Sequence, residues 1–120
     1  IRQADQSLEQ INKTQDIVKH VRLLIAALLG QQALNSDKIA FNLHMSRRSL
    51  HRHLKEQGTS FQEIKNQIII TTAKQALAET QASITDIALQ LGYSEISAFI
   101  RSFKHLTKIT PLKYRKKEQS

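Results

Sequence analysis

One repeated stretch decides the fold of this chain: residues 39–46 read IAFNLHMS, and 48 residues later residues 87–94 read IALQLGYS. Every position matches in residue type except one, where His44 corresponds to Gly92. After the shared serine, one inserted residue changes the offset to 49. The matches then continue as Leu50 with Phe99, Arg52 with Arg101, Leu54 with Phe103 and Lys55 with Lys104. Two copies of one structural unit are the simplest explanation.

The rest of the chain predicts an all-α fold. Its 120 residues include only three Gly and one Pro, and its long runs rich in Ala, Leu, Gln, Lys and Glu favour helix. A β-sandwich would need many more turn residues. About seven helices are predicted, at residues 15–30, 36–43, 46–56, 60–80, 83–91, 95–107 and 111–117. Residues 1–14 are polar and are interpreted as the remnant of an interdomain linker or as a fraying helix start, and residues 118–120 as a tail.

Local signals indicate where these helices begin and end. Gly30, Gly58 and Gly92 each follow a helical run, at the place where a left-handed residue commonly ends a helix. The start signals alternate with these stops: Ser60 with Glu63, Ser83 with Asp86, Thr110 with Pro111, and the candidate N-caps Ser36, Ser46 and Ser94.

Each copy of the repeat has the anatomy of a helix-turn-helix: a short apolar helix, a tight turn and a longer helix with a basic outer face. The turn needs a residue with positive φ, a conformation that Gly92 adopts freely and His44 as one of the tolerated exceptions. Since helix-turn-helix geometry also serves packing alone, the repeat by itself leaves an ordinary pair of helical hairpins open.

The outward face of helix 46–56 favours an anionic partner. Leu50 and Leu54 define the inward face at about 100° per residue. The outward side chains are then Arg48, Arg52 and Lys55, with His51 beside them and Arg47 and His53 on the flanks. Residues 46–55 contain no acid, and an unpaired basic stripe repels itself unless an anion neutralises it.

The helix at 95–107 repeats this arrangement. Phe99, Phe103 and Leu106 are expected to face inward. Ser97, Arg101 and Lys104 then face outward, at the positions equivalent to Arg48, Arg52 and Lys55. Ile96 and Ile100 have two open interpretations: contact with a thymine methyl group, or a wider buried face.

Composition excludes several classes of protein. The net charge is +8. The absence of Cys rules out a disulfide scaffold, a cysteine zinc finger and a thiol enzyme. No apolar run reaches the roughly 18 residues of a membrane span, and no signal peptide is visible. The three Gly are too far apart for a phosphate loop, and no His has a partner at metal-ligand spacing. We therefore predict no enzyme, no metal and no cofactor.

Five motifs carry a resemblance to a known family: residues 46–55 (SRRSLHRHLK), 58–61 (GTSF), 84–94 (ITDIALQLGYS), 97–104 (SAFIRSFK) and 110–115 (TPLKYR). Over residues 36–117 the chain resembles the DNA-binding domain of the AraC/XylS family of bacterial transcription regulators, and residues 15–30 fit its first helix. Three residues depart from the family's pattern: Ile69 replaces an Arg, Leu106 an aromatic residue and Lys108 a Gly. These positions concern packing and helix ends.

The resemblance implies a DNA-binding domain over residues 15–117. Its first helix-turn-helix would be 36–56 and its second 83–107, joined by the long helix 60–80. The two recognition helices would enter successive major grooves, which are about 34 Å apart. The family also implies transcription activation, contact with RNA polymerase, and a separate effector or dimerisation domain preceding residues 1–14. A cytoplasmic location is expected, and the fragment is expected to be monomeric because no helix shows a heptad seam.

The candidate DNA-binding residues divide by role. The best base-contacting candidates are Arg48, His51 and Arg52 in the first recognition helix and Ser97, Ile100 and Arg101 in the second, with Ile96 and Glu95 at its start. Glu95 has a second interpretation, stabilisation of the helix N-terminus, and we favour it. Phosphate contacts are expected from Ser46, Lys55, Ser94 and Lys104, and either role suits Arg47.

The sequence leaves two roles open for the basic residues near the C-terminal end, and two other function classes open for the chain. The cluster is Lys108, Lys113, Arg115, Lys116 and Lys117, which either hold phosphates or form a solvated tail. Composition and helices also suit a basic protein-interaction module or an architectural DNA binder without sequence preference. The protein-interaction module would leave the matching basic stripes unexplained.

Overall fold

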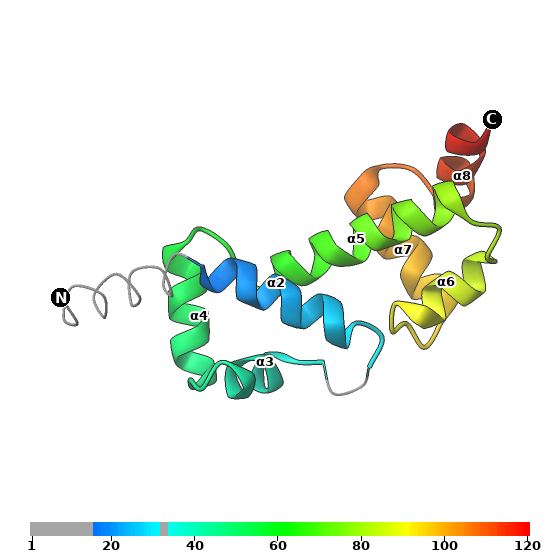
Figure 1. Cartoon of the computed structure of the whole chain (residues 1–120). Coiled ribbons are helices and arrows are strands. Elements are labelled where there is room, and N and C mark those ends of the chain that lie inside the picture. Colours follow the sequence, from blue (N-terminus) through cyan, green and yellow to red (C-terminus); the bar gives the residue numbers. More distant parts are fainter. Residues whose placement is uncertain (1–15, 32–33) are drawn as a thin grey trace. The chain divides into compact units, whose positions relative to one another are not determined.

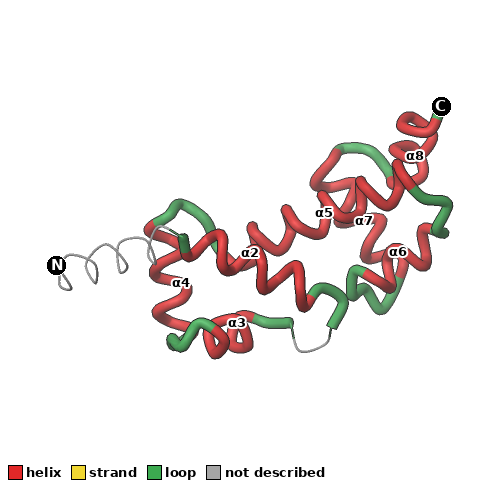
Figure 2. The backbone as a smooth tube through the Cα atoms, in the orientation of Figure 1, coloured by secondary structure: helices red, strands yellow, loops and turns green. Residues whose placement is uncertain are grey.

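The computed structural model describes residues 16–31 and 34–120, so the predicted linker at 1–14 lies outside the described residues. Within them, seven α-helices and no strand are found (Figure 2). The helices are α2 (Ile17–Leu28), α3 (Ser36–Asn42), α4 (Arg47–Glu56), α5 (Phe61–Glu79), α6 (Ile84–Gln90), α7 (Ile96–Thr107) and α8 (Pro111–Gln119). The predicted all-α class is confirmed.

Side-chain caps begin most of these helices where the sequence predicted. Ser46, Ser83 and Thr110 each accept a hydrogen bond from the backbone N–H three residues on, at 3.0, 3.0 and 3.2 Å. Ser60 accepts from the Glu63 N–H at 3.1 Å. These bonds satisfy donors that a helix start leaves without a partner inside the helix.

Two predicted caps are wrong by one residue. Asn35, not Ser36, caps α3, and its side-chain oxygen accepts from the Lys38 N–H at 2.8 Å. Glu95, not Ser94, is the N-cap of α7, and it makes no side-chain cap bond. Asn35 and Ser36 both qualify by residue type, whereas glutamate is not a preferred N-cap, so at α7 the backbone path prevails over residue type.

The chain divides into two compact units. The first comprises residues 1–27 and 33–65 as far as they are described, and its buried apolar side chains come from α2, α3, α4 and the start of α5. The second comprises residues 28–32 and 66–120. Its core is Ile69, Ala73, Leu77, Ile87, Ala88, Leu91, Phe99 and Phe103. The long helix α5 begins in the first unit and continues in the second (Figure 1).

The two helix-turn-helix turns are built identically. In the first, the Met45 N–H donates to the Ala40 carbonyl at 3.0 Å and the His44 N–H to the Phe41 carbonyl at 3.1 Å. In the second, Tyr93 donates to Ala88 and Gly92 to Leu89, both at 3.0 Å. His44 has a φ of 58° and Gly92 a φ of 98°, as the turn position requires. The repeat read from the sequence is therefore a repeat of backbone structure.

Gly30 makes a close backbone approach inside the second unit. It follows α2 with a φ of 86°. A Cβ atom placed on Gly30 would lie 2.3 Å from the Gln90 carbonyl oxygen, and one placed on Gly92 would lie 3.3 Å from the Gly30 Cα. Gly30 thus rests on the turn between α6 and α7, with no room for a side chain.

Candidate nucleic-acid interface

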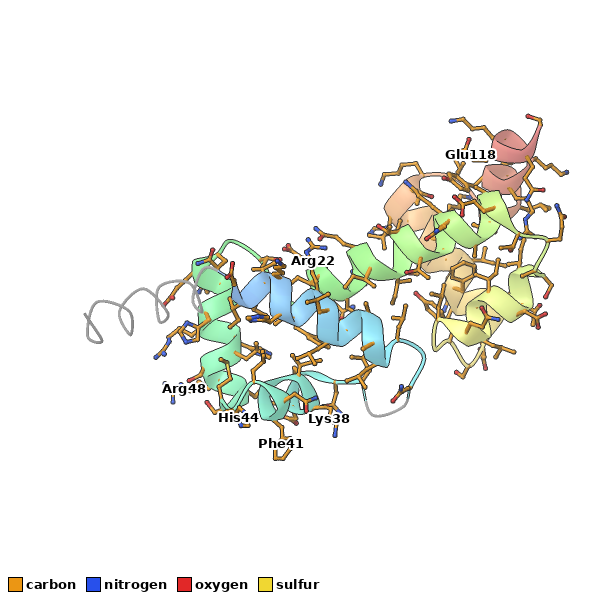
Figure 3. All side chains as sticks on the ribbon, in the orientation of Figure 1. Arg22, Lys38, Phe41, His44, Arg48 and Glu118 are labelled. Atoms are coloured by element: carbon orange, nitrogen blue, oxygen red, sulfur yellow. The ribbon has the colours of Figure 1, made fainter. Side chains whose placement is uncertain are left out.

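The first candidate surface is the outer face of α4. Leu50 and Leu54 are fully buried and fix the orientation of the helix. The candidates on the helix and at its N-cap are all exposed: Ser46, Arg47, Arg48, His51, Arg52 and Lys55. Figure 3 shows Arg48 on the outer side of α4. The predicted division of this helix into an apolar inner face and a basic outer face is found in the structure.

The basic side chains of α4 differ in whether an acidic side chain lies near them. The Arg47 Nε atom lies 3.7 Å from the Asp37 Oδ1 atom, and both side chains are mostly exposed, so the pair contributes little to stability. His53 Nδ1 lies 3.7 Å from the Glu56 Oε2 atom. Within the described part of the chain, no acidic oxygen lies within 4 Å of Arg48, Arg52 or Lys55. These three side chains present their charge to solvent, as an anion-binding surface requires.

A cavity lies beside α4 that the sequence did not reveal. Its volume is about 450 Å³, and its lining includes the cationic or titratable side chains of Lys55 and His51. The other lining residues are Ser36, Thr59, Ser60, Phe61 and Gln62. They come from the start of α3 and from the connection into α5, so only a fold that brings these segments together creates it.

The second candidate surface is the outer face of α7. On its inner face, Phe99 and Phe103 are part of a row of four aromatic rings. The row runs Tyr93, Phe99, Phe103, Tyr114, with centroid distances of 5.4, 5.8 and 5.8 Å between successive rings. Ser94, Glu95, Ser97, Arg101 and Lys104 are exposed. Offset and edge-on ring pairs of this kind contribute beyond the area they bury, so they set the helix firmly.

The apolar residues of α7 only partly follow the prediction. Ile96 is 38% exposed, whereas Ile100 is partly buried, as its place at the margin suggested. Leu106, predicted to face inward, is 41% exposed. The partly buried Thr107, four residues after Phe103, continues the inner face instead. On α5, Ile69, which stands where the resemblance implies an Arg, is 5% exposed and belongs to the core of the second unit.

The terminal basic cluster does not act as one group. Lys113, Lys116 and Lys117 are exposed on α8. Lys108 ends α7 in the left-handed conformation with a φ of 73°, the role the family gives to Gly. Arg115 instead donates from Nε to the Leu77 carbonyl at 3.1 Å and from Nη2 to the Thr80 carbonyl at 3.3 Å.

Tyr114 has a shifted pKa. Burial, then a hydrogen bond to the Glu118 carboxylate, then the charge of that carboxylate raise the pKa of Tyr114 above its usual value of 10.0. Glu118 lies on α8 (Figure 3). It follows Tyr114 by four residues, which is about one helical turn. This pair belongs to the packing between α7 and α8 and not to either basic face.

Other kinds of site find little support in the described residues. There, no three His, Cys, Asp or Glu side chains gather in a way that could hold a metal ion. None of the described helices is long and apolar enough to cross a membrane.

Comparison with known proteins gives consistent matches. Residues 39–117 match the helix-turn-helix domain family. Over 113 residues the chain is 34% identical to the ornithine utilization regulator of Pseudomonas aeruginosa, a match that covers 94% of this chain and 33% of that protein. It is also 41% identical over 91 residues to an uncharacterized HTH-type transcriptional regulator of Bacillus subtilis, which covers 75% of this chain and 12% of that one. The chain thus spans a third or less of these relatives.

Solved structures show the same architecture. A transcriptional regulator with an AraC-type DNA-binding domain from Chromobacterium violaceum superposes with a TM-score of 0.79 at 28% identity, over 87% of this chain and 93% of that one. The C-terminal domain of AraT, a response regulator from Geobacillus stearothermophilus, superposes with a TM-score of 0.77 at 29% identity, over 84% of each chain.

Proposed function

Because the chain belongs to the AraC family of helix-turn-helix transcriptional regulators and forms their DNA-binding domain, we propose that it reads a specific double-stranded site with both helix-turn-helix units. The observation that carries this proposal is the duplicated outer face. Arg48, Arg52 and Lys55 on α4 are matched by Ser97, Arg101 and Lys104 on α7, and all six are exposed. A packing hairpin gives no reason for such a match.

In this proposal the two recognition helices, α4 and α7, each enter a major groove. Successive major grooves on one face of B-DNA are about 34 Å apart, so the site holds two boxes roughly ten base pairs apart. Arg52 and Arg101 are suited to guanine, which accepts two hydrogen bonds from one guanidinium. Lys55 and Lys104 lie at the next outward positions and are suited to phosphates, which position the protein without reading sequence.

The remaining assignments rest on exposure and side-chain chemistry. His51 and Arg48 are proposed base contacts in the first box, and Ser97 in the second. Ile96 is exposed enough to contact a thymine methyl group, whereas Ile100 is partly buried and contributes to packing as well. The remaining proposed contacts are Ser46, Arg47, Ser94 and Glu95, at the starts of the two helices.

The wider role is proposed from the family. We place the domain in a bacterial cytoplasmic regulator that activates transcription by contacting RNA polymerase. A further domain N-terminal to these residues would bind an effector or dimerise.

The experiment that tests sequence reading is selection of duplexes from a randomised library at near-physiological salt, with excess competitor DNA. Enrichment of two boxes about one helical turn apart supports the proposal. Retention without enrichment contradicts it and favours an architectural binder. Absence of retention even at low salt contradicts it and favours a protein-interaction module.

The selected duplex then tests individual residues. Arg52→Ala and Arg101→Ala should each relax discrimination in one box only. Lys19→Ala is the matched control, since Lys19 is an exposed cation on α2 outside the proposed interface. If Arg52→Ala relaxes both boxes equally, the assignment of one box to each helix is wrong.

A further inference from the structure

The C-terminal end of α5 has an unusual cap. A helix leaves its last four carbonyl groups without partners inside the helix, and a glycine just beyond the end commonly helps to satisfy them. No glycine follows α5, which ends at Glu79. Thr80 bonds back to the Ala76 carbonyl through both its backbone N–H and its hydroxyl, at 3.1 and 2.6 Å.

Two side chains of α8 donate to further carbonyl groups at this end. The Arg115 guanidinium spans the Leu77 and Thr80 carbonyls at 3.1 and 3.3 Å. The Gln119 amide donates to the same two oxygens, each at 2.9 Å. Arg115 and Gln119 lie one turn apart on α8 and face the end of α5, and we call this pair with its carbonyl partners the clasp. Figure 1 shows α8 beside the end of α5 within the second unit.

The clasp also reaches the recognition helix. Tyr114, which directly precedes Arg115, packs edge-on against Phe103 of α7 at 5.8 Å and 69°. The Lys74 ammonium of α5 lies 5.8 Å from the Tyr114 ring centroid. Phe103 is fully buried, whereas Arg101 and Lys104 beside it are exposed on the outer face. A movement of α8 therefore changes what supports α7 from within.

We infer that Arg115 is a positioning residue for the second recognition helix, acting through the clasp on α5 and through Tyr114, and that it is not a phosphate ligand. Charge alone is not enough for this role. The planar guanidinium presents several donors in a fixed fork and bridges two carbonyl oxygens, whereas an ammonium is a single point charge. The inference rests on the proposed reading of DNA by α7, but the clasp itself can be tested without DNA.

The sharpest variant is Arg115→Lys, because it keeps the charge and removes the fork. A clasp predicts that Arg115→Lys and Arg115→Ala both lower the midpoint of thermal unfolding, by about 5–10 °C for the alanine variant. Both should also speed amide hydrogen exchange in the last turn of α5 and in α7. Lys116→Ala, an exposed neighbour on the same helix, is the matched control and should change neither.

DNA binding gives the second readout. On a random-sequence duplex, the slope of log affinity against log salt is negative, and loss of one phosphate contact makes it less steep by about 0.9. An unchanged slope for Arg115→Ala therefore supports the clasp. On the selected duplex, well below the unfolding temperature, discrimination in the α7 box should fall about tenfold for both Arg115 variants. Discrimination in the α4 box should stay as in the unaltered chain.

Two results would overturn the inference. In the first, Arg115→Lys keeps the stability and discrimination of the unaltered chain, while Arg115→Ala makes the slope of log affinity against log salt less steep by the amount expected for one phosphate contact. The other is an Arg115→Ala variant with unchanged unfolding and exchange. If Arg115→Ala does not fold, Gln119→Ala decides instead, because it removes only the neutral half of the clasp and should give a smaller loss of the same kind. If the unaltered chain selects no DNA site, the proposed function fails, while unfolding and exchange still decide the clasp.

Discussion

Gly30→Ala is the substitution that tests the packing of the second unit most directly. Two costs act together at this position. A Cβ atom in the left-handed region costs about 1 kcal/mol relative to glycine. The same atom would also lie 2.3 Å from the Gln90 carbonyl oxygen, far inside van der Waals contact. Because both partners are backbone, a helix end or a turn must move, and overpacking of this kind costs about 1–3 kcal/mol. The expected loss is about 2–4 kcal/mol.

The other two glycines calibrate that value. Gly58 has a similar φ of 77°, but nothing lies within 4 Å of its Cβ position. Gly58→Ala should therefore show only the conformational cost, about 1 kcal/mol. Gly92→Ala, with its Cβ 3.3 Å from the Gly30 Cα, should fall between the two. Destabilisation by alanine is thus expected to be smallest at Gly58, larger at Gly92 and largest at Gly30.

The assay is thermal and denaturant unfolding of the three variants, followed by circular dichroism. Since Gly58 lies in the first unit and the other two glycines in the second, amide hydrogen exchange is needed to assign each loss to its unit. A shift of about 4–8 °C per kcal/mol is expected for units of this size. If Gly30→Ala costs no more than Gly58→Ala, the close approach between Gly30 and the α6–α7 turn does not contribute to stability and the reasoning fails.

Three further outcomes are expected. Arg52→Ala should weaken binding to the selected duplex by about 1–3 kcal/mol. If the variant binds both the selected and the random duplex as the unaltered chain does, Arg52 does not read a base. His44→Gly should stabilise the first unit by about 0.5–1 kcal/mol, since the φ of 58° disfavours histidine; a lower unfolding midpoint would contradict this. Tyr114 has a raised pKa in the folded protein, so it contributes stability that is complete below pH 10 and is lost as the pH rises through the folded value. Compared with Tyr114→Phe, the unaltered chain should lose more stability above pH 10, and Glu118→Gln should reduce but not abolish this difference, because burial also raises the pKa.

The sequence was most informative where neighbouring residues decide the structure. Ser46, Ser83 and Thr110 cap their helices because the bond runs to a backbone N–H only three residues away. The left-handed turn residues His44 and Gly92 were visible for the same reason, through the repeat that places them. Helical periodicity likewise identified Leu50 and Phe99 as buried and the basic residues as exposed.

Prediction was weaker where two local choices are nearly equal. Asn35 and Ser36 are both good caps, and only the path of the chain selects Asn35. At α7 the good cap type, Ser94, is passed over, and the helix begins after Glu95 without a side-chain cap bond. Leu106 is apolar and three residues beyond Phe103, yet it is 41% exposed, because the inner face of α7 continues through Thr107 and the helix then ends. Periodicity gives a direction around a helix axis, but not which neighbour covers it.

By itself, then, the sequence determined the helices, the duplicated turn and the two basic faces, because each depends on contacts within a few residues. Only the tertiary structure decided the rest. Arg115 reads as one more basic residue of a tail until it is found at the Leu77 carbonyl, 38 positions away along the chain. Gly30 reads as an ordinary helix stop until its backbone is found against that of Gln90 and Gly92. Both depend on which distant backbone groups are left without partners or without room, and that is fixed only when the whole unit packs.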